Sequence, residues 1–325
     1  MKKIIYLVPY FGKLPQIFPL WLKSAECNPT INWKIFTDDD DHYDYPTNVN
    51  VVKTTFVDFA NKFRNHFDFN ISLDYPYKLC EYKVTYGDVL ADQISEYDYW
   101  GYCDLDLIFG DIREFITSEV LSEYEMIGFQ GHSTLYKNVP EVNKRYTHIT
   151  ENVNYRTLLS SYKYHFFDEH GILEIYEDLN LTWWSKVVFA NISPMYWNFR
   201  LTHQDKTGRE KNKNRIFTWN KGKLYSHSLV GGKIVTDEFM YVHFLRREMK
   251  IIPPVNDAVL KIIPNKFISL STPINPKMVK YDSRDRPIYY WINLIWRKRK
   301  KMTTQNIIRF LKHYIKHRKI DKKRG

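Results

Sequence analysis

Two aspartates one residue apart, Asp104 and Asp106, have the residue type and spacing of a metal site. They follow residues 97–103, a run rich in aromatic and apolar side chains that is typical of a buried strand. Side chains two positions apart in an extended segment point to the same face, so the two carboxylates should lie side by side. Close carboxylates repel each other unless a cation lies between them, and hard divalent cations prefer carboxylate oxygens. The pattern predicts a metal site for a substrate diphosphate. The alternative is a strand exit whose acids are solvated or cap a helix.

The ends of the first two predicted strands carry further residues suited to ligand binding. Residues 3–8 have the composition of a strand buried on both faces, and residues 33–36 form a second strand after a helix at 18–26. This order predicts a parallel α/β sheet, in which ligands bind beyond the carboxyl ends of the strands. The first turn contains Pro9, Tyr10, Phe11 and Gly12, and the second contains Asp38 and Asp39. We expect both turns to share one crevice with Asp104 and Asp106.

Two lysines lie on the helical pattern that leads into the aspartate strand. Lys78 and Lys83 are five residues apart, so they do not share a helix face fully. At the edge of the crevice either one could reach a phosphate or a base. Both could also be ordinary surface lysines whose aliphatic stems pack on the protein.

An acidic pair, Asp168 and Glu169, precedes a helical pattern at residues 172–179. Asp168 suits the N-cap of that helix, with Glu169 in its first turn. One of the two carboxylates could also face the crevice as a general base, and a cap position is compatible with that role. Farther along the chain, His243 and Arg246 end an apolar strand that begins at residue 239. Taken alone, His243 is more consistent with a structural histidine.

The basicity of the chain is concentrated at its end. Of the net charge of +11, +12 comes from residues 297–325, so residues 1–296 carry −1. This distribution argues against a general nucleic-acid-binding surface and favours one localised anionic partner. Residues 291–296 are apolar and aromatic, and apolar residues recur at helical spacing among the basic ones from 307 to 315. We expect residues 291–325 to form a basic amphipathic helix on an anionic membrane surface. The alternative is a Trp cluster packed on the body, followed by a solvated basic end.

The remaining composition indicates a large core and a reducing compartment. The chain has 325 residues, of which 44% are hydrophobic and 17% aromatic. Its cysteines are few, odd in number and without metal-ligand spacing, which favours the cytoplasm. No stretch reaches the length of a transmembrane helix. We therefore expect a cytoplasmic protein, peripheral on the inner face of the cell membrane.

Over roughly residues 1–250 these landmarks resemble the GT-A family of nucleotide-sugar-dependent glycosyltransferases, particularly small bacterial enzymes of capsular and cell-surface polysaccharide synthesis. Asp104-Leu105-Asp106 matches the metal motif of that family, and His243 is similar to its C-terminal metal-contacting histidine. The turn at 9–12 looks like the nucleotide-binding turn, and Asp38-Asp39 resembles the acids that contact base or ribose. Residues 168–169 are similar to the acidic motif on the acceptor side, although members often have the order Glu-Asp.

The resemblance implies a Rossmann-like GT-A fold, with a mixed central sheet flanked by helices and a basic helical tail. The catalytic domain would span residues 1–286, with a nucleotide-binding half at about 1–130 and an acceptor half at about 131–286, and the tail would span 287–325. A hexosyltransferase of this kind moves a sugar from a nucleotide-diphosphate donor, with UDP as the expected nucleotide, to a lipid-linked oligosaccharide or polysaccharide. Mn²⁺ or Mg²⁺ would be held by Asp104, Asp106 and His243. The donor would also contact Lys78, Lys83 and Arg246.

The catalytic step and the function class each leave an alternative open. An inverting enzyme would use Asp168 or Glu169 as the base, whereas a retaining enzyme would need none. A haloacid-dehalogenase-like phosphohydrolase also carries Asp-x-Asp after an apolar strand, but on an early strand and followed by Thr or Val, where this chain has Leu107. A non-catalytic membrane-surface protein would use the basic tail alone and would leave the acids at the strand ends unexplained.

Overall fold

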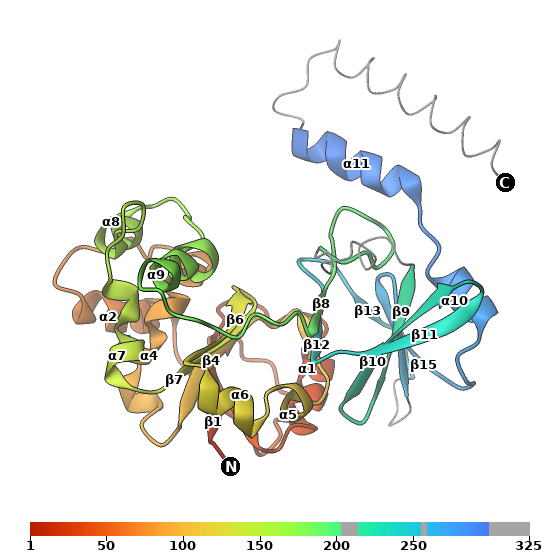
Figure 1. Cartoon of the computed structure of the whole chain (residues 1–325), viewed down its shortest axis with the longest axis horizontal. Helices are drawn as coiled ribbons and strands as arrows, with labels where there is room; N and C mark the ends of the chain where they lie inside the picture. Colours follow the sequence, from red (N-terminus) through yellow and green to blue (C-terminus); the bar gives the residue numbers. More distant parts are fainter. Residues whose placement is uncertain (203–213, 255–258, 299–325) are drawn as a thin grey trace, which may run out of the picture.

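The computed structural model describes residues 1–202, 214–254 and 259–298. These residues form a mixed α/β structure with a central six-stranded sheet, a second six-stranded sheet and a three-stranded sheet between them (Figure 1). The expectation of a mixed central sheet flanked by helices is confirmed. The second sheet was not anticipated as a separate layer.

The central sheet has the strand order β3-β2-β1-β4-β7-β6. Strands β1, β2, β3 and β4 run parallel, and β7 and β6 add an antiparallel edge. The strand bounds are β1 (Ile4–Pro9), β2 (Ile31–Thr37), β3 (Val49–Lys53), β4 (Tyr99–Cys103), β6 (Met126–Gln130) and β7 (Ser133–Lys137). Because β1 and β4 lie in the middle, the segments that follow them meet at one edge of the sheet.

Alternation along β1 divides the core into two layers. Ile4, Tyr6 and Val8 pack on one face of the sheet, and Ile5 and Leu7 pack on the other. The first face is covered by α1 (Phe18–Glu26), α5 (Ile112–Phe115) and α6 (Ser118–Glu123). The second face is covered by α2 (Phe56–His66), α3 (Leu79–Tyr82), α4 (Tyr86–Val89), α7 (Pro140–Asn143), α8 (Tyr155–Ser160) and α9 (Ile172–Asp178). With both faces covered, the two middle strands, β1 and β4, are buried along nearly their whole length.

A small sheet, β5-β12-β8, connects the central sheet to the second one. Its strands are β5 (Leu107–Phe109), β12 (Tyr241–His243) and β8 (Phe189–Asn191). Leu107 and Phe109 pack into the core of the central sheet, whereas Ile108 packs into a third core shared with the second sheet. The second sheet consists of β9 (Arg215–Asn220), β10 (Lys223–Val230), β11 (Lys233–Glu238), β13 (Lys250–Ile251), β14 (Leu260–Ile263) and β15 (Lys266–Ser269).

Two segments are less regular than their composition suggests. Residues 112–123 contain two helices, α5 and α6, because Thr117 accepts a hydrogen bond from the Val120 N–H and starts the second helix there. Strand β8 begins only at Phe189. Before it, Trp184 forms an isolated bridge with Ile127 of β6.

The C-terminal part contains α10 (Pro276–Asp282) and α11 (Pro287–Lys298), which lies apart from the sheets in Figure 1. Tyr290 of α11 stacks on Tyr196, and Tyr289 meets Trp197 edge-on. Residues 299–325 lie outside the described residues, so the division into 1–286 and 287–325 stays a prediction. Within the described part of the chain, no helix has the length and apolarity needed to cross a membrane.

Candidate active site

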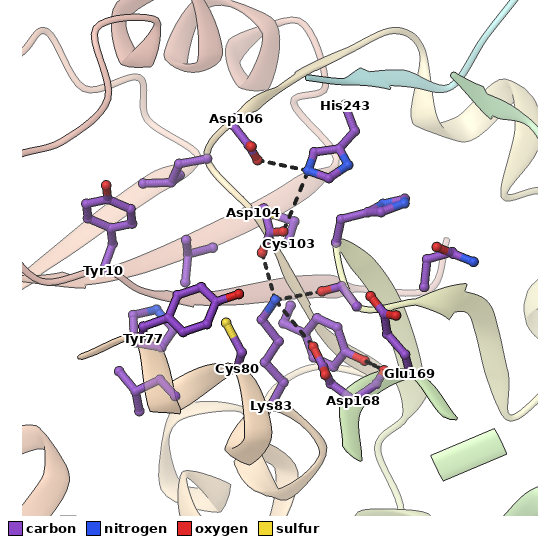
Figure 2. Close-up of a pocket in the computed structure, with 18 of the residues that line it drawn as sticks. Tyr10, Tyr77, Cys80, Lys83, Cys103, Asp104, Asp106, Asp168, Glu169 and His243 are labelled. Atoms are coloured by element: carbon purple, nitrogen blue, oxygen red, sulfur yellow. Dashed lines mark hydrogen bonds and ion pairs between the residues drawn. The ribbon is translucent and has the colours of Figure 1, made fainter. Parts of the chain in front are cut away.

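A cavity of about 890 Å³ opens beyond the carboxyl ends of β1 and β4. Its volume is near the top of the range of about 300–1,000 Å³ that is usual for ligand sites. Figure 2 shows the acids, Lys83, His243 and tyrosines that line it. Most of the residues singled out from the sequence line this cavity: Pro9, Tyr10, Phe11, Lys83, Asp104, Asp106, Asp168, Glu169, His243 and Arg246. Gly12, Asp38, Asp39 and Lys78 do not.

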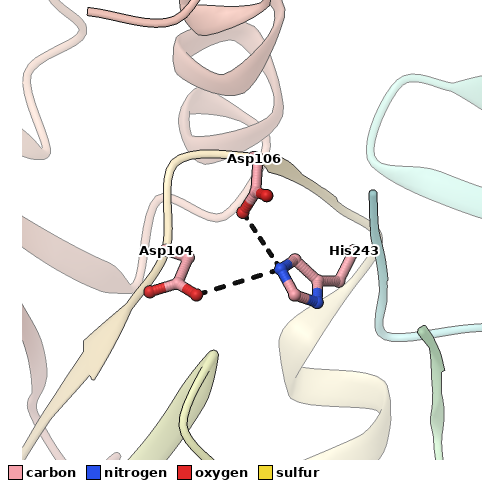
Figure 3. A group of neighbouring side chains, drawn as sticks. All are labelled: Asp104, Asp106 and His243. Atoms are coloured by element: carbon pink, nitrogen blue, oxygen red, sulfur yellow. Dashed lines mark ion pairs between the residues drawn. The ribbon is translucent and has the colours of Figure 1, made fainter. Parts of the chain in front are cut away.

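Asp104, Asp106 and His243 meet at the centre of the cavity, with potential ligand atoms all within 4.8 Å of one another (Figure 3). The His243 Nε2 atom lies 3.0 Å from Asp106 Oδ1 and 3.8 Å from Asp104 Oδ2. Leu105 is buried in the core, and residues 105 and 106 form a bend between β4 and β5, so a bend, not the alternation of a strand, brings the two carboxylates together. These three side chains could bind a metal ion. Carboxylates and imidazoles are common ligands of divalent cations, and three protein ligands would leave coordination positions open.

The pairing of strands in the small sheet places His243 beside Asp104 and Asp106. Strand β12 pairs with β5 and β8, so that His243 lies opposite Leu107 on one side and Asn191 on the other. The Asn191 Oδ1 atom is 3.0 Å from His243 Nδ1 and can accept a hydrogen bond from the Nδ1–H group. The Nε2 atom then faces the carboxylates. Asn191 was not anticipated from the sequence, because its place depends on the pairing of strands fifty residues apart.

The electrostatics of this group fit a cation site. Burial disfavours the charge of Asp106, but the positive charge and hydrogen bond of His243 lower the pKa of this carboxyl to about 2. Burial likewise opposes protonation of His243, yet the Asp106 carboxylate raises the pKa of the imidazole above its usual value. The Asp106 carboxylate therefore stays charged beside the His243 imidazole.

Lys83 joins the metal-site acids to the acidic pair. Its Nζ atom donates to Asp104 Oδ1 at 2.7 Å and to the Gly131 carbonyl at 2.6 Å, and lies 3.7 Å from Asp168 Oδ2. Burial opposes its charge, but the Asp104 and Asp168 carboxylates hold the pKa of Lys83 well above its usual range. The side chain is therefore a fixed cation in the floor of the cavity.

Asp168 is almost fully buried, and it is not the helix N-cap that was expected. It lies within a single turn, Phe167–Gly171, that precedes α9, and its Oδ1 accepts a hydrogen bond from the Tyr164 hydroxyl at 2.8 Å. Burial raises the pKa of Asp168 to about 7, against the lowering effect of Lys83. Gly131 permits this approach, because a Cβ atom there would lie 2.4 Å from Asp168 Oδ2. Glu169 is half-buried and lines the same wall.

Asp38 and Asp39 shape the first turn instead of lining the cavity. Asp38 Oδ1 accepts the Gly12 N–H at 2.7 Å, and Asp39 Oδ2 accepts the Leu14 N–H at 2.6 Å. Gly12 has a φ of +92°, a conformation that favours glycine. The two acids therefore hold the turn that presents Pro9, Tyr10 and Phe11.

Lys78 does not line the cavity either, because it is completely buried. It pairs with Glu81 at 3.3 Å, and neither side chain is exposed. Lys78 also donates to the Lys163 carbonyl, and the two carboxylate oxygens of Glu81 accept the N–H groups of His165 and Phe167 at 2.6 and 2.8 Å. This ion pair anchors the backbone that leads to Asp168. It has no role as a phosphate ligand in this geometry.

Arg246 also lines the cavity. Its backbone N–H donates to Asp106 Oδ2 at 2.9 Å, and its guanidinium lies over the Tyr77 ring, 5.3 Å from the centroid. Leu245 and Arg246 both have positive φ angles, of 44° and 61°. The turn after β12 is therefore bent sharply to bring this backbone to the metal-site acid.

Residues 6–271 match the model of a protein family described as a family of unknown function, DUF6625. The chain belongs to this family. A search of curated proteins finds no match. Among solved structures, a crystal structure of the galactosyltransferase LgtC in complex with donor and acceptor sugar analogues is distantly similar, with a TM-score of 0.30 and 12% sequence identity. The match covers 75% of this chain and 87% of LgtC. A likeness this distant supports no particular activity for a DUF6625 member.

The buried Lys78–Glu81 pair generates a stability prediction. Glu81→Gln should destabilise the fold by about 3–5 kcal/mol, because it leaves the Lys78 ammonium buried without a counter-charge. Urea denaturation followed by circular dichroism measures the change. The matched control is Glu96→Gln, an exposed acid on the same half, which should alter stability by less than about 0.5 kcal/mol. Equal stability of Glu81→Gln and wild type would contradict the anchoring role.

Proposed function

We propose that this protein is a metal-dependent glycosyltransferase that uses a nucleotide-diphosphate sugar as donor. The observation that carries the proposal is the Asp104–Asp106–His243 group at the centre of a large cavity. A cation bound there would neutralise the negative charge that grows on the departing diphosphate. A cavity of about 890 Å³ has room for a donor and for part of an acceptor.

The two walls of the cavity suit different substrates. Tyr10 is half-buried and presents an aromatic ring near Asp106, which suits a nucleotide base, whereas Phe11 packs mainly on Phe56 and Phe59. Arg246, on the turn bonded to Asp106, carries a positive charge that suits the diphosphate. We assign this side to the donor, with UDP as the nucleotide. The opposite wall, which contains Asp168 and Glu169, is assigned to the acceptor.

Asp168 and Glu169 have different contacts, and we assign them different roles. Asp168 is held by Tyr164 and Lys83, so it serves to fix the wall and the Lys83 charge. Glu169 is more open to the cavity and is the carboxylate that would take the proton of an acceptor hydroxyl in an inverting reaction. In a retaining reaction, Glu169 would orient the acceptor by hydrogen bonding.

The C-terminal helix supports a membrane-bound acceptor. Along α11, Ile288, Ile292, Ile295 and Trp296 are exposed, with 61% of the Trp296 surface accessible. Asn293, between them, donates to the carbonyls of Pro194 and Met195 and ties the helix to the body. The sequence continues from this apolar face into the basic run that starts at Arg297. We propose that 291–325 binds the anionic inner leaflet, where a lipid-linked oligosaccharide or polysaccharide would be the acceptor.

The metal assignment predicts the donor chemistry. Asp106→Asn should lower Mn²⁺-dependent hydrolysis of UDP-sugars at least about a hundredfold, because it removes a charged ligand. A panel of UDP-hexoses with and without EDTA, assayed for released UDP, measures this. Asp40→Asn, an exposed acid outside the cavity, is the control and should retain full rate. Metal-independent turnover, or full activity of folded Asp106→Asn protein, would reject the proposal.

The membrane assignment has its own measurement. The intact chain should co-sediment with anionic phosphatidylglycerol vesicles but not with neutral phosphatidylcholine vesicles, and binding should weaken as salt rises. A chain cut after Pro287 should lose this binding, because both the apolar face of α11 and the basic run are removed. If the truncated chain bound as well as the intact one, the membrane contact would lie elsewhere.

A further inference from the structure

A strip of aromatic side chains leads out of the cavity along its acceptor wall. We call it the aromatic strip; its members are Tyr75, Tyr77, Tyr162, Tyr164, Phe166 and His170. The rings meet in sequence, with centroid distances of 5.9 Å for Tyr77–Tyr164, 4.6 Å for Tyr164–Phe166 and 6.1 Å for Phe166–His170. These four residues line the cavity. The remaining pair, Tyr75–Tyr162 at 5.4 Å, lies outside the cavity lining, and its members stand two residues before Tyr77 and Tyr164 in the sequence.

Four rings of the strip are exposed to solvent, and the other two, Tyr75 and Tyr164, are half-buried. Tyr162 is 68% exposed, Tyr77 50% and Phe166 48%. Exposed aromatic side chains that gather at one place usually mark a binding surface. The strip also alternates with polar residues, Lys163 and His165, so that it is not a continuous apolar patch.

The backbone that carries Phe166 is held in one conformation by a buried carboxylate, that of Glu81. Phe166 has a φ of 59°, in the left-handed region that is unfavourable for a bulky residue. The backbone on both sides of it is held by the buried Glu81 carboxylate, which accepts the His165 and Phe167 N–H groups. This arrangement turns Phe166 outward and the next acid, Asp168, inward. A rigid ring beside the catalytic acids is preorganised for a ligand.

The chemistry of the strip points to a carbohydrate chain. A pyranose ring has an apolar C–H face that packs on aromatic rings and an edge of hydroxyls that suits phenol and imidazole groups. Since four of the six rings lie inside the cavity and two beyond it, a single sugar would not cover them. We propose that the aromatic strip binds an extended oligosaccharide acceptor, with its reacting end at Glu169 and its chain running over Phe166 and Tyr164 towards Tyr162. This inference rests on the proposed transfer reaction and adds the residues that bind the acceptor chain.

The test is binding to an array of defined mono- to hexasaccharides, probed with the intact wild-type chain. Oligosaccharides should bind, and the best series should bind more tightly as its length rises from one to several sugars. Phe166→Ala and Tyr162→Ala should each weaken binding of the longest member roughly tenfold, because each removes one stacking surface. Phe166→Tyr should restore it. Tyr281→Ala, an exposed tyrosine on α10 away from the strip, is the control and should match wild type.

Several outcomes would overturn the proposal. These are the absence of oligosaccharide binding, equal binding by a folded Phe166→Ala/Tyr162→Ala double variant, and no dependence on chain length. Loss of vesicle binding in that double variant would assign the strip to lipid instead and would also overturn it. Calorimetry with Mn²⁺ and UDP tests the proposed function separately from the oligosaccharide site. If UDP binds but no oligosaccharide does, only the role of the aromatic strip is rejected. If an oligosaccharide binds but UDP does not, the nucleotide-sugar reaction is rejected.

Discussion

The structure depends on balancing several carboxylates in one partly buried cavity. Asp104, Asp106, Asp168 and Glu169 all line it, and burial opposes ionisation of the two whose pKa values shift most, Asp106 and Asp168. The counter-charges come from Lys83, which contacts Asp104 and lies near Asp168, and from His243, which pairs with Asp106. The cavity thus gathers four acids around Lys83, His243 and Arg246, and a divalent cation held by Asp104, Asp106 and His243 would add further counter-charge.

The elements around the site are arranged to keep this balance. The cross-strand pairing of β12 brings His243 to the aspartates, and Asn191 on the neighbouring strand orients the ring. Gly131 lets Asp168 approach Lys83, and the buried Lys78–Glu81 pair holds the backbone that carries Asp168. If either Lys78 or Glu81 were replaced by a neutral residue, the other would be left as a buried charge without a counter-charge. Each member of the pair is therefore needed as long as the other is present.

Sequence patterns were sufficient for the features set by local periodicity. The apolar run at 3–8 predicted the buried central strand correctly, because a continuous apolar run is a local feature. The two aspartates do lie close together, but they are in a bend after β4 and not along an extended strand. The roles of Lys78, Asp38 and Asp39 could not be obtained in this way. A lysine that anchors a loop and one that lines a cavity look alike in sequence, and only tertiary packing decides which is buried. Asn191 and Gly131 depend on pairing and approach between distant segments, which a single sequence does not encode locally.

The central claim is that Asp104, Asp106 and His243 hold a divalent cation that receives a nucleotide diphosphate. The most direct measurement is anomalous X-ray diffraction from crystals of the intact chain soaked with Mn²⁺ and UDP. The account predicts one manganese peak about 2.0–2.3 Å from an oxygen of each aspartate and from His243 Nε2, with the diphosphate oxygens completing the shell. A manganese peak elsewhere, or UDP bound in the cavity with no metal at these three residues, would contradict it.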